Sequence, residues 1–552
     1  MIGDKRGLQA ELRKTQANYV PLSPVSFLTR AAKVHPEKLA ISYGEQRTTY
    51  GVFYTRVRRF ASALANLNVG LGDTVSVLAP NIPALLEAHY AVPAIGAVLS
   101  AINTRLDAAS VAFILEHSEA KVLLVDDEFA DLVTAVLKLS KAKPHIIRIV
   151  DNANTSASQI TPVEYEDFLA SGDPQYDLQL PKNEWQPITL NYTSGTTGDP
   201  KGAVYSHRGA YLNAVANTIS FGMTSDTVYL WILPMFHCNG WSHTWAVTLA
   251  GGTHVCLRKV EPKAVFEQIE CTGVTHVCAA PIVLNMLIHA PDEIKKRPAK
   301  VLKIATGGAP PPSTVIAGME DMGFEVVHLY GLTETYGPAT ICEKQGDWAG
   351  LPKDEIALRL ARQGQSHPLI EDYQVGDIDN AGAVPANGDK VGEIQIRSNT
   401  IMMGYHKNPT ATKIAFKDGW FHSGDLAVMH SDNYLDIKDR ANDVIISGGE
   451  NLSSIEIEEV LTRNPKIRAA AVVAKPDDKW GETPCAFVEL VETAACDAQE
   501  VIDWCRKNMA GFKVPKDVVF GELPKTSTGK VKKFVLREHA CNLAQKGVVR
   551  QT

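Results

Sequence analysis

The run from Tyr192 to Gly202 constrains this chain more than any other stretch. It reads Tyr-Thr-Ser-Gly-Thr-Thr-Gly-Asp-Pro-Lys-Gly, and strand-like residues precede it (Pro187–Tyr192) and follow it (Ala203–His207). Glycines let backbone N–H groups approach a ligand closely, while the hydroxyls and Lys201 add donors and a positive charge. This combination is typical of a phosphate-binding loop. The residues predicted to bind phosphate are Thr193, Ser194, Gly195, Thr196, Thr197, Gly198 and Lys201.

This loop differs from the common P-loop. Counted from Gly195, that motif needs Gly, Lys and then Ser or Thr where this chain has Pro200, Lys201 and Gly202. Taken alone, the stretch fits an ordinary polar turn equally well, so the choice between the two depends on the rest of the chain.

Composition narrows the class of protein. Of the 552 residues, 45% are hydrophobic and 21% are charged, which is typical of a globular chain long enough for several domains. The net charge of −7 argues against a nucleic-acid partner. We recognise no apolar run long enough for a bilayer and no secretory, lipidation or peroxisomal signal, and the nine cysteines are scattered. We therefore expect a cytoplasmic protein with reduced thiols and no membrane contact.

The organisation of the chain follows from its hydrophobic periodicity. Helical and strand-like runs alternate from residue 24 to 150, which predicts a partly parallel sheet with helices on its faces. Residues 151–182 are polar and irregular, so we interpret them as surface loops. The fold class predicted is α/β, with a large N-terminal domain of layered sheets and helices (1–438). A hinge (439–443) leads to a smaller, mobile α+β lid domain (444–552).

Four further segments combine polar residues with glycine or aromatics, and three of them follow predicted strands that end at Pro234, Thr306 and Leu329. In open α/β sheets, ligands bind at the carboxyl ends of strands. A histidine among aromatics suits a pocket for a partly apolar molecule, although a packed core corner is the alternative. The four segments are Met235–Trp241, Gly307–Pro310, Tyr330–Thr335 and a compact turn, Gly419–Asp425.

Two other patterns suggest different chemistry. Thr253–Cys256 and Thr275–Cys278 both read Thr-His-Val-Cys in strand-like runs, so four zinc ligands meet only if the two strands are neighbours. No Cys-x-x-Cys knuckle accompanies them. Gly70-Leu71-Gly72 begins like a dinucleotide fingerprint, but Val75 stands at its third glycine, so we set aside an NAD-type oxidoreductase.

Together and in this order, the motifs resemble those of the adenylate-forming superfamily of acyl-CoA ligases, luciferases and peptide-synthetase adenylation domains. The resemblance covers residues 24–540. The matching motifs are Tyr192–Gly202 (phosphate), Tyr330–Thr335 (adenine and metal), Trp420–Asp425 (ribose), Asp439–Glu450 (hinge region) and Pro524–Lys530 (lysine loop).

The resemblance implies a two-step ligase. A carboxylate and ATP give an acyl-adenylate and pyrophosphate, and coenzyme A then accepts the acyl group and releases AMP. No carrier-domain serine motif is found, which disfavours a peptide synthetase, whereas the motifs alone leave luciferase open. Intact Lys530 and Glu334 argue against a non-catalytic nucleotide sensor.

Roles for single residues also come from the resemblance. Lys530 is expected to bridge the substrate carboxylate and the α-phosphate, and Glu334, next to Thr333, to hold Mg²⁺. Tyr330 is expected to stack on adenine, and the lid to swing after the first step. The remaining ATP or AMP contacts implied are Gly308, Ala309, Gly331, Asp425, Ile437 and Arg440, the last with Asp425 on the ribose.

The acyl and coenzyme A sites are implied in the same way. The acyl pocket comprises His237, which is also expected to act as a gate and catalytic residue, with Asn239, Gly240, Trp241, Gly307 and Tyr336. The coenzyme A site comprises Ser447, Gly448, Gly449, Glu450 and Trp480. Asn442 occupies the hinge position, where the family usually has Asp or Lys, so the orientation favoured by the hinge stays open. Family members are often dimers, so a homodimer is an expectation.

The segments Pro234–Trp241 and Gly307–Pro312 look most like the medium-chain and plant-type acyl-activating branch, which includes 3-methylmercaptopropionate-CoA, benzoate and cinnamate ligases. Bulky Trp241 and Tyr336 indicate a pocket of limited depth. We expect a short or medium, weakly polar acid, with 3-methylmercaptopropionate as the named candidate. An aromatic acid or a medium-chain fatty acid is the alternative, since one methylene changes discrimination by only about 1–3 kcal/mol.

Overall fold

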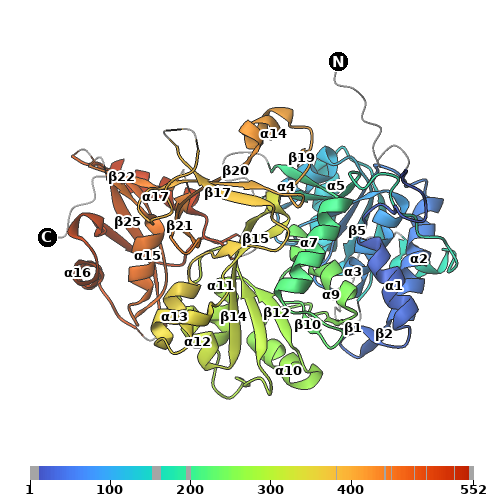
Figure 1. Ribbon diagram of the computed structural model, residues 1–552, viewed down its shortest axis with the longest axis horizontal. Helices are drawn as coiled ribbons and strands as arrows, with labels where there is room; N and C mark the ends of the chain where they lie inside the picture. Colours follow the sequence, from blue (N-terminus) through green and yellow to red (C-terminus); the bar gives the residue numbers. More distant parts are fainter. Residues whose placement is uncertain are drawn as a thin grey trace.

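The computed structural model describes residues 12–151, 163–193, 200–378, 380, 382–440, 443–448, 450–477, 479–492, 494–526 and 529–545. Figure 1 shows a large part that runs from α1 to β21 and a smaller C-terminal part, orange to red, beside it. The α/β fold predicted from the sequence is confirmed. Within the described residues, no helix has both the length and the apolar character needed to cross a membrane.

An eight-stranded sheet forms one layer of the large part, in the order β19-β9-β8-β4-β3-β5-β6-β7. Its centre is parallel, whereas β8 and β9 are antiparallel and flank the predicted phosphate loop. The strands are β3 (Thr74–Leu78), β4 (Val98–Ala101), β5 (Ala120–Asp126), β6 (His145–Ile149), β7 (Val163–Glu164), β8 (Pro187–Tyr192), β9 (Gly202–Ser206) and β19 (Gly404–Tyr405).

A nine-stranded sheet forms the second layer, in the order β16-β15-β14-β13-β12-β10-β11-β1-β2. The strands β10 to β14 run parallel to one another, so their carboxyl ends lie at one edge. The strands are β1 (Leu39–Tyr43), β2 (Gln46–Thr49), β10 (Val228–Leu230), β11 (Thr253–Val255), β12 (His276–Ala279), β13 (Leu302–Thr306), β14 (Phe324–Leu332), β15 (Gly337–Ile341) and β16 (Gln365–Ser366).

Helices cover these sheets and bury their apolar faces in the main core. α2 begins after Thr49, whose hydroxyl accepts the backbone N–H of Val52 and so caps the helix. The helices are α1 (Val25–Val34), α2 (Tyr50–Asn66), α3 (Pro83–Ala91), α4 (Ala108–His117), α5 (Ala130–Leu139), α6 (Tyr165–Ala170), α7 (His207–Ser220), α8 (Cys238–Trp241), α9 (His243–Ala250), α10 (Pro262–Thr272), α11 (Pro281–Ile288), α12 (Ser313–Asp321), α13 (Lys353–Leu360) and α14 (Pro409–Ala415).

Two smaller sheets complete the chain. The first has the order β17-β18-β20-β21, formed by β17 (Asp372–Gly376), β18 (Gly392–Arg397), β20 (Phe421–Met429) and β21 (Leu435–Arg440). The second belongs to the C-terminal part and is formed by β22 (Ile445–Ser447), β23 (Glu450–Leu452), β24 (Ile467–Asp477), β25 (Gly481–Leu490) and β26 (Asp517–Phe520). The C-terminal helices are α15 (Ser454–Thr462), α16 (Ala498–Asn508) and α17 (Lys533–Gln545).

Three local predictions need correction. The polar stretch 151–182 contains β7 and α6, because Tyr165, Phe168 and Leu169 bury one face of a short helix whose neighbours are acidic. The strand predicted over 228–234 ends at Leu230. The compact turn predicted at Gly419–Asp425 is strand β20 from Phe421 onward, since pairing with β18 and β21 overrides the turn character of Ser423-Gly424.

The two Thr-His-Val-Cys segments lie on either side of β10. β11 and β12 each pair with β10, so the strands are not neighbours. The His254 ring accepts a hydrogen bond from Trp231 Nε1 (3.1 Å) and contacts Thr248 Oγ1 (2.9 Å). The His276 ring donates to the Phe221 carbonyl (2.9 Å). Both rings therefore have partners other than a metal, and the strand arrangement does not support zinc.

Seven histidines are buried in neutral form. Burial lowers the pKa of each to about 3 or 4, from an ordinary value of 6.5; they are His89, His207, His237, His243, His254, His328 and His367. Between about pH 4 and 6.5 these histidines bind protons in the unfolded chain but not in the folded chain. Protonation therefore favours unfolding as the pH falls below about 6.5.

We expect the contribution of these histidines to the free energy of unfolding to be constant near pH 8 and to fall between about pH 6.5 and 4. Each histidine that stays neutral when folded contributes a loss of about 1.4 kcal/mol per pH unit. Urea unfolding midpoints at about pH 8, 6.5 and 5.5 test this. Equal midpoints at the highest and lowest of these pH values would contradict it.

Candidate active site

Three of the predicted site residues, Tyr330, Asp425 and Arg440, meet in the large part. Asp425 on β20 pairs in register with Arg440 on β21, and their side chains form an ion pair, with Arg440 Nε 3.1 Å from Asp425 Oδ1. Tyr330, at the end of β14, donates its hydroxyl to the other oxygen of Asp425 at 2.8 Å. Burial and the Asp425 carboxylate raise the pKa of Tyr330 well above its ordinary value. These three side chains therefore form one rigid, charged unit.

Lys530 faces this unit from the last loop of the C-terminal part. Burial is the main cause that lowers the pKa of Lys530 to about 8; Arg440 contributes to this shift, while Asp425 and Asp443 oppose it. Burial lowers the pKa of His237 to about 4, and the charge of Lys530 contributes to that shift. The charge of Lys530 is therefore electrostatically coupled to the His237 imidazole, the Arg440 guanidinium and the Asp425 carboxylate.

The ends of the phosphate loop are held by strand pairing. Thr193 N–H donates to the Lys201 carbonyl at 2.9 Å, which extends the β8–β9 pair by one step. Residues 194–199 of the predicted loop, from Ser194 to Gly198 among the site residues, lie outside the described residues. Lys201 Nζ lies 5.1 Å from the centre of the Tyr405 ring, a cation–π contact.

Tyr405 was not predicted from the sequence, and it links this lysine to Glu334. Its hydroxyl donates to Glu334 Oε1 at 2.6 Å, while the Glu334 carbonyl accepts the Met402 N–H at 2.8 Å. No periodicity or glycine pattern marks Tyr405 as functional, because it follows Gly404 in a two-residue strand. Only its contacts with Lys201 and Glu334 in the folded chain indicate a role for Tyr405.

The donor set at Glu334 fits Mg²⁺ that arrives on a nucleotide. Within the described ranges, no group of three or more His, Cys, Asp or Glu residues suits a metal ion. Mg²⁺ commonly binds through one or two carboxylates together with substrate phosphates and water, so a single oriented carboxylate suffices. The neighbouring Thr333 hydroxyl, 3.6 Å from Cys238 Sγ, adds an oxygen of the right type.

A left-handed turn follows His237. Cys238, Asn239, Trp241 and Ser242 all have φ between +44° and +61°, and Gly240 lies between them at +60°. Such a conformation costs about 1–2 kcal/mol for each non-glycine residue, so surrounding contacts must hold it.

Buried polar groups supply those contacts. Asn239 Oδ1 accepts from Asn191 Nδ2 at 2.7 Å, and Asn239 Nδ2 donates to His89 Nε2 at 3.1 Å. Asn217 Nδ2 donates to the Trp241 carbonyl at 2.7 Å. The side chain of Asn239 is fully buried, so this residue supports the turn, and its predicted contact with an acid stays a prediction.

Trp241 and Tyr336 fill the space where the acyl pocket was predicted. A side chain at Gly307 would approach within 3.3 Å of Trp241 Cη2, so the glycine makes room for the indole ring. The Tyr336 ring is fully buried against Tyr205, with ring centres 3.7 Å apart. Tyr205, another residue missed from the sequence, also donates its hydroxyl to the Thr333 carbonyl. The aromatic cluster thus joins the acyl segment to the Thr333–Glu334 segment.

The other predicted nucleotide contacts differ in exposure. Gly308 is exposed with φ +83°, and no atom lies within 4 Å of where a side chain would be, so this glycine faces open space. Ala309 is half-buried, and Ile437 is buried on β21. Gly331 packs tightly on the Gly337 carbonyl, which excludes any side chain there.

The predicted coenzyme A residues lie on the C-terminal part. Gly448 N–H donates to the Trp480 carbonyl at 2.8 Å, and the indole packs over Gly448, which leaves Trp480 45% exposed. Ser447 is half-buried and Glu450 is exposed. Asn442 and Gly449 lie outside the described residues, while Asp439 and Arg440 of the predicted hinge belong to β21. Thus the strand continues into the predicted hinge.

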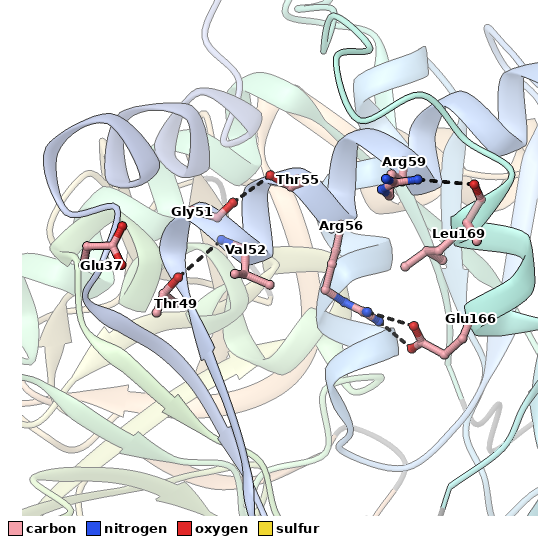
Figure 2. Close-up of a pocket in the computed structure, with 10 residues that line it drawn as sticks. Glu37, Thr49, Gly51, Val52, Thr55, Arg56, Arg59, Glu166 and Leu169 are labelled. Atoms are coloured by element: carbon pink, nitrogen blue, oxygen red, sulfur yellow. Dashed lines mark hydrogen bonds and ion pairs between the residues drawn. The ribbon is translucent and has the colours of Figure 1, made fainter.

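A separate groove of about 510 Å³ lies between α2 and α6, on a part of the large domain that carries no predicted site residue (Figure 2). Its arginines are already occupied. Arg56 binds Glu166 and the buried Glu87, and Arg59 donates to the Ala170 and Gly172 carbonyls. Both arginines that line the groove thus already have partners, and their ion pairs and hydrogen bonds hold α6 against α2.

Comparison with known proteins decides the family. The profile described as AMP-binding enzyme matches residues 28–406, and the profile of the AMP-binding enzyme C-terminal domain matches residues 456–530. The chain belongs to the AMP-binding enzyme family. It is an AMP-forming acyl-CoA ligase, in agreement with the resemblance seen in its motifs.

Relatives of this ligase cover nearly its whole length. It is 47% identical over 548 residues to acetate–CoA ligase CCL3 of Humulus lupulus, covering 96% of each chain. It is equally 47% identical to the peroxisomal trans-cinnamate:CoA ligase of Petunia hybrida, again over 96% of each chain. ATP-bound MatB from Rhodopseudomonas palustris has the same fold, with a TM-score of 0.82, 25% identity and coverage of 93% of this chain and 98% of that one.

Proposed function

We propose that this ligase activates a short or medium-length, weakly polar carboxylic acid, with 3-methylmercaptopropionate as the first candidate. In the first step a carboxylate oxygen attacks the α-phosphorus of ATP, the bond to pyrophosphate breaks, and an acyl-adenylate forms. In the second step the thiol of coenzyme A attacks the acyl carbon, its proton is released, and AMP leaves. The observation that carries the proposal is the Asp425–Arg440 ion pair bonded to Tyr330, to which the charge of Lys530 is electrostatically coupled.

Lys530 supplies positive charge where the carboxylate and the α-phosphate meet. Two anions repel each other on approach, and a fixed ammonium group lowers that repulsion most in a desolvated site. Asp425 and Arg440 are proposed to hold the ribose, and the Thr193–Lys201 loop the outer phosphates. Glu334, oriented by Tyr405, would hold Mg²⁺, which supplies charge neutralisation for the departing pyrophosphate when it is bound. The chain's own contribution is thus mainly positioning and charge.

The second step is assigned to the C-terminal part. Trp480 offers an exposed indole face above Gly448, which suits the pantetheine arm of coenzyme A. Ser447, Gly449 and Glu450 remain predicted members of that site, and Asn442 remains the predicted hinge position. The domain limits at 439–443 likewise stay a prediction.

The acid is inferred from the filled acyl region. Trp241 is 5% exposed and Tyr336 is fully buried, so neither leaves a deep channel beneath the acyl segment. A short thioether acid fits such a space. An aromatic acid is the second candidate, supported by the relative whose printed name is trans-cinnamate:CoA ligase.

A substrate panel tests the proposed function. Pyrophosphate release is measured with acetate, butyrate, 3-methylmercaptopropionate, octanoate, benzoate and cinnamate, with ATP, Mg²⁺ and coenzyme A present. The proposal expects the highest kcat/KM for the thioether acid and a need for coenzyme A during turnover. A higher kcat/KM for cinnamate or benzoate would replace the substrate assignment, whereas no pyrophosphate with any acid would overturn the proposed reaction.

Trp241→Ala is expected to lengthen the preferred acid. Removing the indole beside Gly307 opens space for several methylenes, so the ratio of kcat/KM for octanoate to that for butyrate should rise about 10- to 100-fold. Trp185→Ala is the matched control, because Trp185 is 49% exposed. An unchanged ratio in Trp241→Ala would remove Trp241 from the acyl pocket.

Location and assembly stay predictions. The cytoplasmic location and the homodimer are expectations from the sequence. The Petunia hybrida relative is named as peroxisomal.

A further inference from the structure

The C-terminal part touches the large part through α11 and α12 as well as through the site. Ser313 Oγ, at the start of α12, donates to Glu459 Oε1 of α15 at 2.7 Å. Gly529, next to Lys530, has φ +86°, and a side chain there would lie 2.3 Å from Ile282 Cγ2 on α11. Thus the lysine loop and α15 are both seated on the same helical pair.

The Ser313–Glu459 contact has the features of a strong hydrogen bond. The Ser313 side chain is largely buried, and its acceptor is a carboxylate, which makes the bond charge-assisted. The carboxylate also lies at the N-terminus of α12, where the helix dipole favours negative charge. The Glu459 carboxylate also accepts from Arg463, the residue that follows α15, at a longer 3.4 Å.

A short series of contacts joins this hydrogen bond to Lys530. Glu458, the neighbour of Glu459 on α15, forms an ion pair with Lys533 at 2.7 Å. Lys533 begins α17 and stands three residues after Lys530. On the other side, Ser313 follows Gly307–Ala309 after three prolines, which restrict the backbone between them. The Ser313–Glu459 hydrogen bond therefore connects the Gly307–Ser313 segment to α15, and α15 is in turn paired with Lys533, three residues after Lys530.

We propose that Ser313 and Glu459 are positioning residues that hold Lys530 in the site during adenylate formation. The proposal rests on the proposed role of Lys530 in the first step. It requires that loss of the hydrogen bond slows the first step and spares the second, because coenzyme A transfer from a preformed adenylate makes no use of Lys530 in this orientation.

The test measures the two half-reactions separately on full-length enzyme. ATP–pyrophosphate exchange reports the first step, with the acid from the panel that the wild type adenylates fastest. Coenzyme A-dependent AMP release from the matching synthetic acyl-adenylate reports the second. Ser313→Ala is expected to lower the exchange rate about 10-fold, the effect of losing one hydrogen bond to a charged group, and to change AMP release less than about twofold.

Two further variants sharpen the result. Glu459→Gln keeps an acceptor oxygen without the charge, so a smaller loss of about threefold is expected in exchange alone. Arg463→Ala removes the other partner of Glu459 and should leave both half-reactions unchanged. Where Ser313→Ala fails to fold, Glu459→Gln decides the matter.

Equal losses in both half-reactions, or no loss of exchange in Ser313→Ala and Glu459→Gln, would overturn the positioning role. Lys530→Ala, measured alongside, separates this from failure of the proposed function. If Lys530→Ala retains exchange, the role of Lys530 is wrong, and the positioning proposal falls with it.

Discussion

Lys530→Ala is expected to lower acid-dependent ATP–pyrophosphate exchange about 1,000-fold or more, while coenzyme A transfer from a supplied acyl-adenylate continues. The ammonium group is the one predicted catalytic charge that the C-terminal part brings to Asp425 and Arg440 in the described structure. Removing a preorganised charge at the reacting atoms typically costs about 10²–10³ in rate, and repulsion between two unshielded anions adds to this. Separate assays of the two half-reactions measure the effect.

Lys516→Ala is the matched control, since Lys516 is an exposed lysine of the same C-terminal part. It should leave both half-reactions unchanged. Equal loss of exchange and coenzyme A transfer in Lys530→Ala would show that the residue supports the fold rather than the first step.

Asp425→Asn is expected to lower adenylation about 100-fold and to shift its pH dependence. Asp425 pairs with Arg440 and accepts the Tyr330 hydroxyl, so its loss leaves the Arg440 guanidinium without its counter-charge. Asp425 also raises the pKa of Lys530, which burial and Arg440 hold at about 8. Lys530 is charged below that pKa, so wild-type adenylation should fall as the pH rises through about 8. In Asp425→Asn this fall should begin at a lower pH.

Adenylation rates between about pH 6.5 and 9.5 measure both effects, and Lys530→Arg provides the control. A guanidinium remains charged throughout this range, so the alkaline fall should disappear in Lys530→Arg even where its rate is lower. Superimposable pH profiles for wild type and Asp425→Asn would contradict electrostatic coupling between Asp425 and Lys530.

Much of the local structure was predictable. The strand predicted at Pro187–Tyr192 has the observed limits, and the strand predicted to end at Thr306 ends there, because each is a short run rich in β-prone residues followed by a glycine-containing segment. The errors arose where pairing overrides composition. A compact turn was predicted at Gly419–Asp425, yet β18 and β21 on either side hold the segment extended from Phe421 onward.

The site was predictable as a list of residues and only partly as an arrangement. The motif residues Tyr330, Asp425, Arg440 and Lys530 were all named from the sequence, because glycine-rich, acidic and lysine-tipped loops retain recognisable patterns. Tyr405 and Ser313 were not named. A tyrosine in a short strand and a serine at a helix start are common, and only their contacts with Glu334 and Glu459 give them a role.

The sequence by itself determined the order of the elements, the α/β class and the family motifs that specify ATP-dependent activation of an acid. The tertiary structure decided which of those motifs meet: Tyr330 and Asp425 bond across 95 residues, and Ser313 and Glu459 across 146. The physical reason is that side-chain periodicity records which face of an element is buried, not which other element covers it. The order of the strands, the contact of the C-terminal part with α11 and α12, and the packing of Trp241 and Tyr336 all depend on which element covers which face. That is decided by the packing of the whole chain.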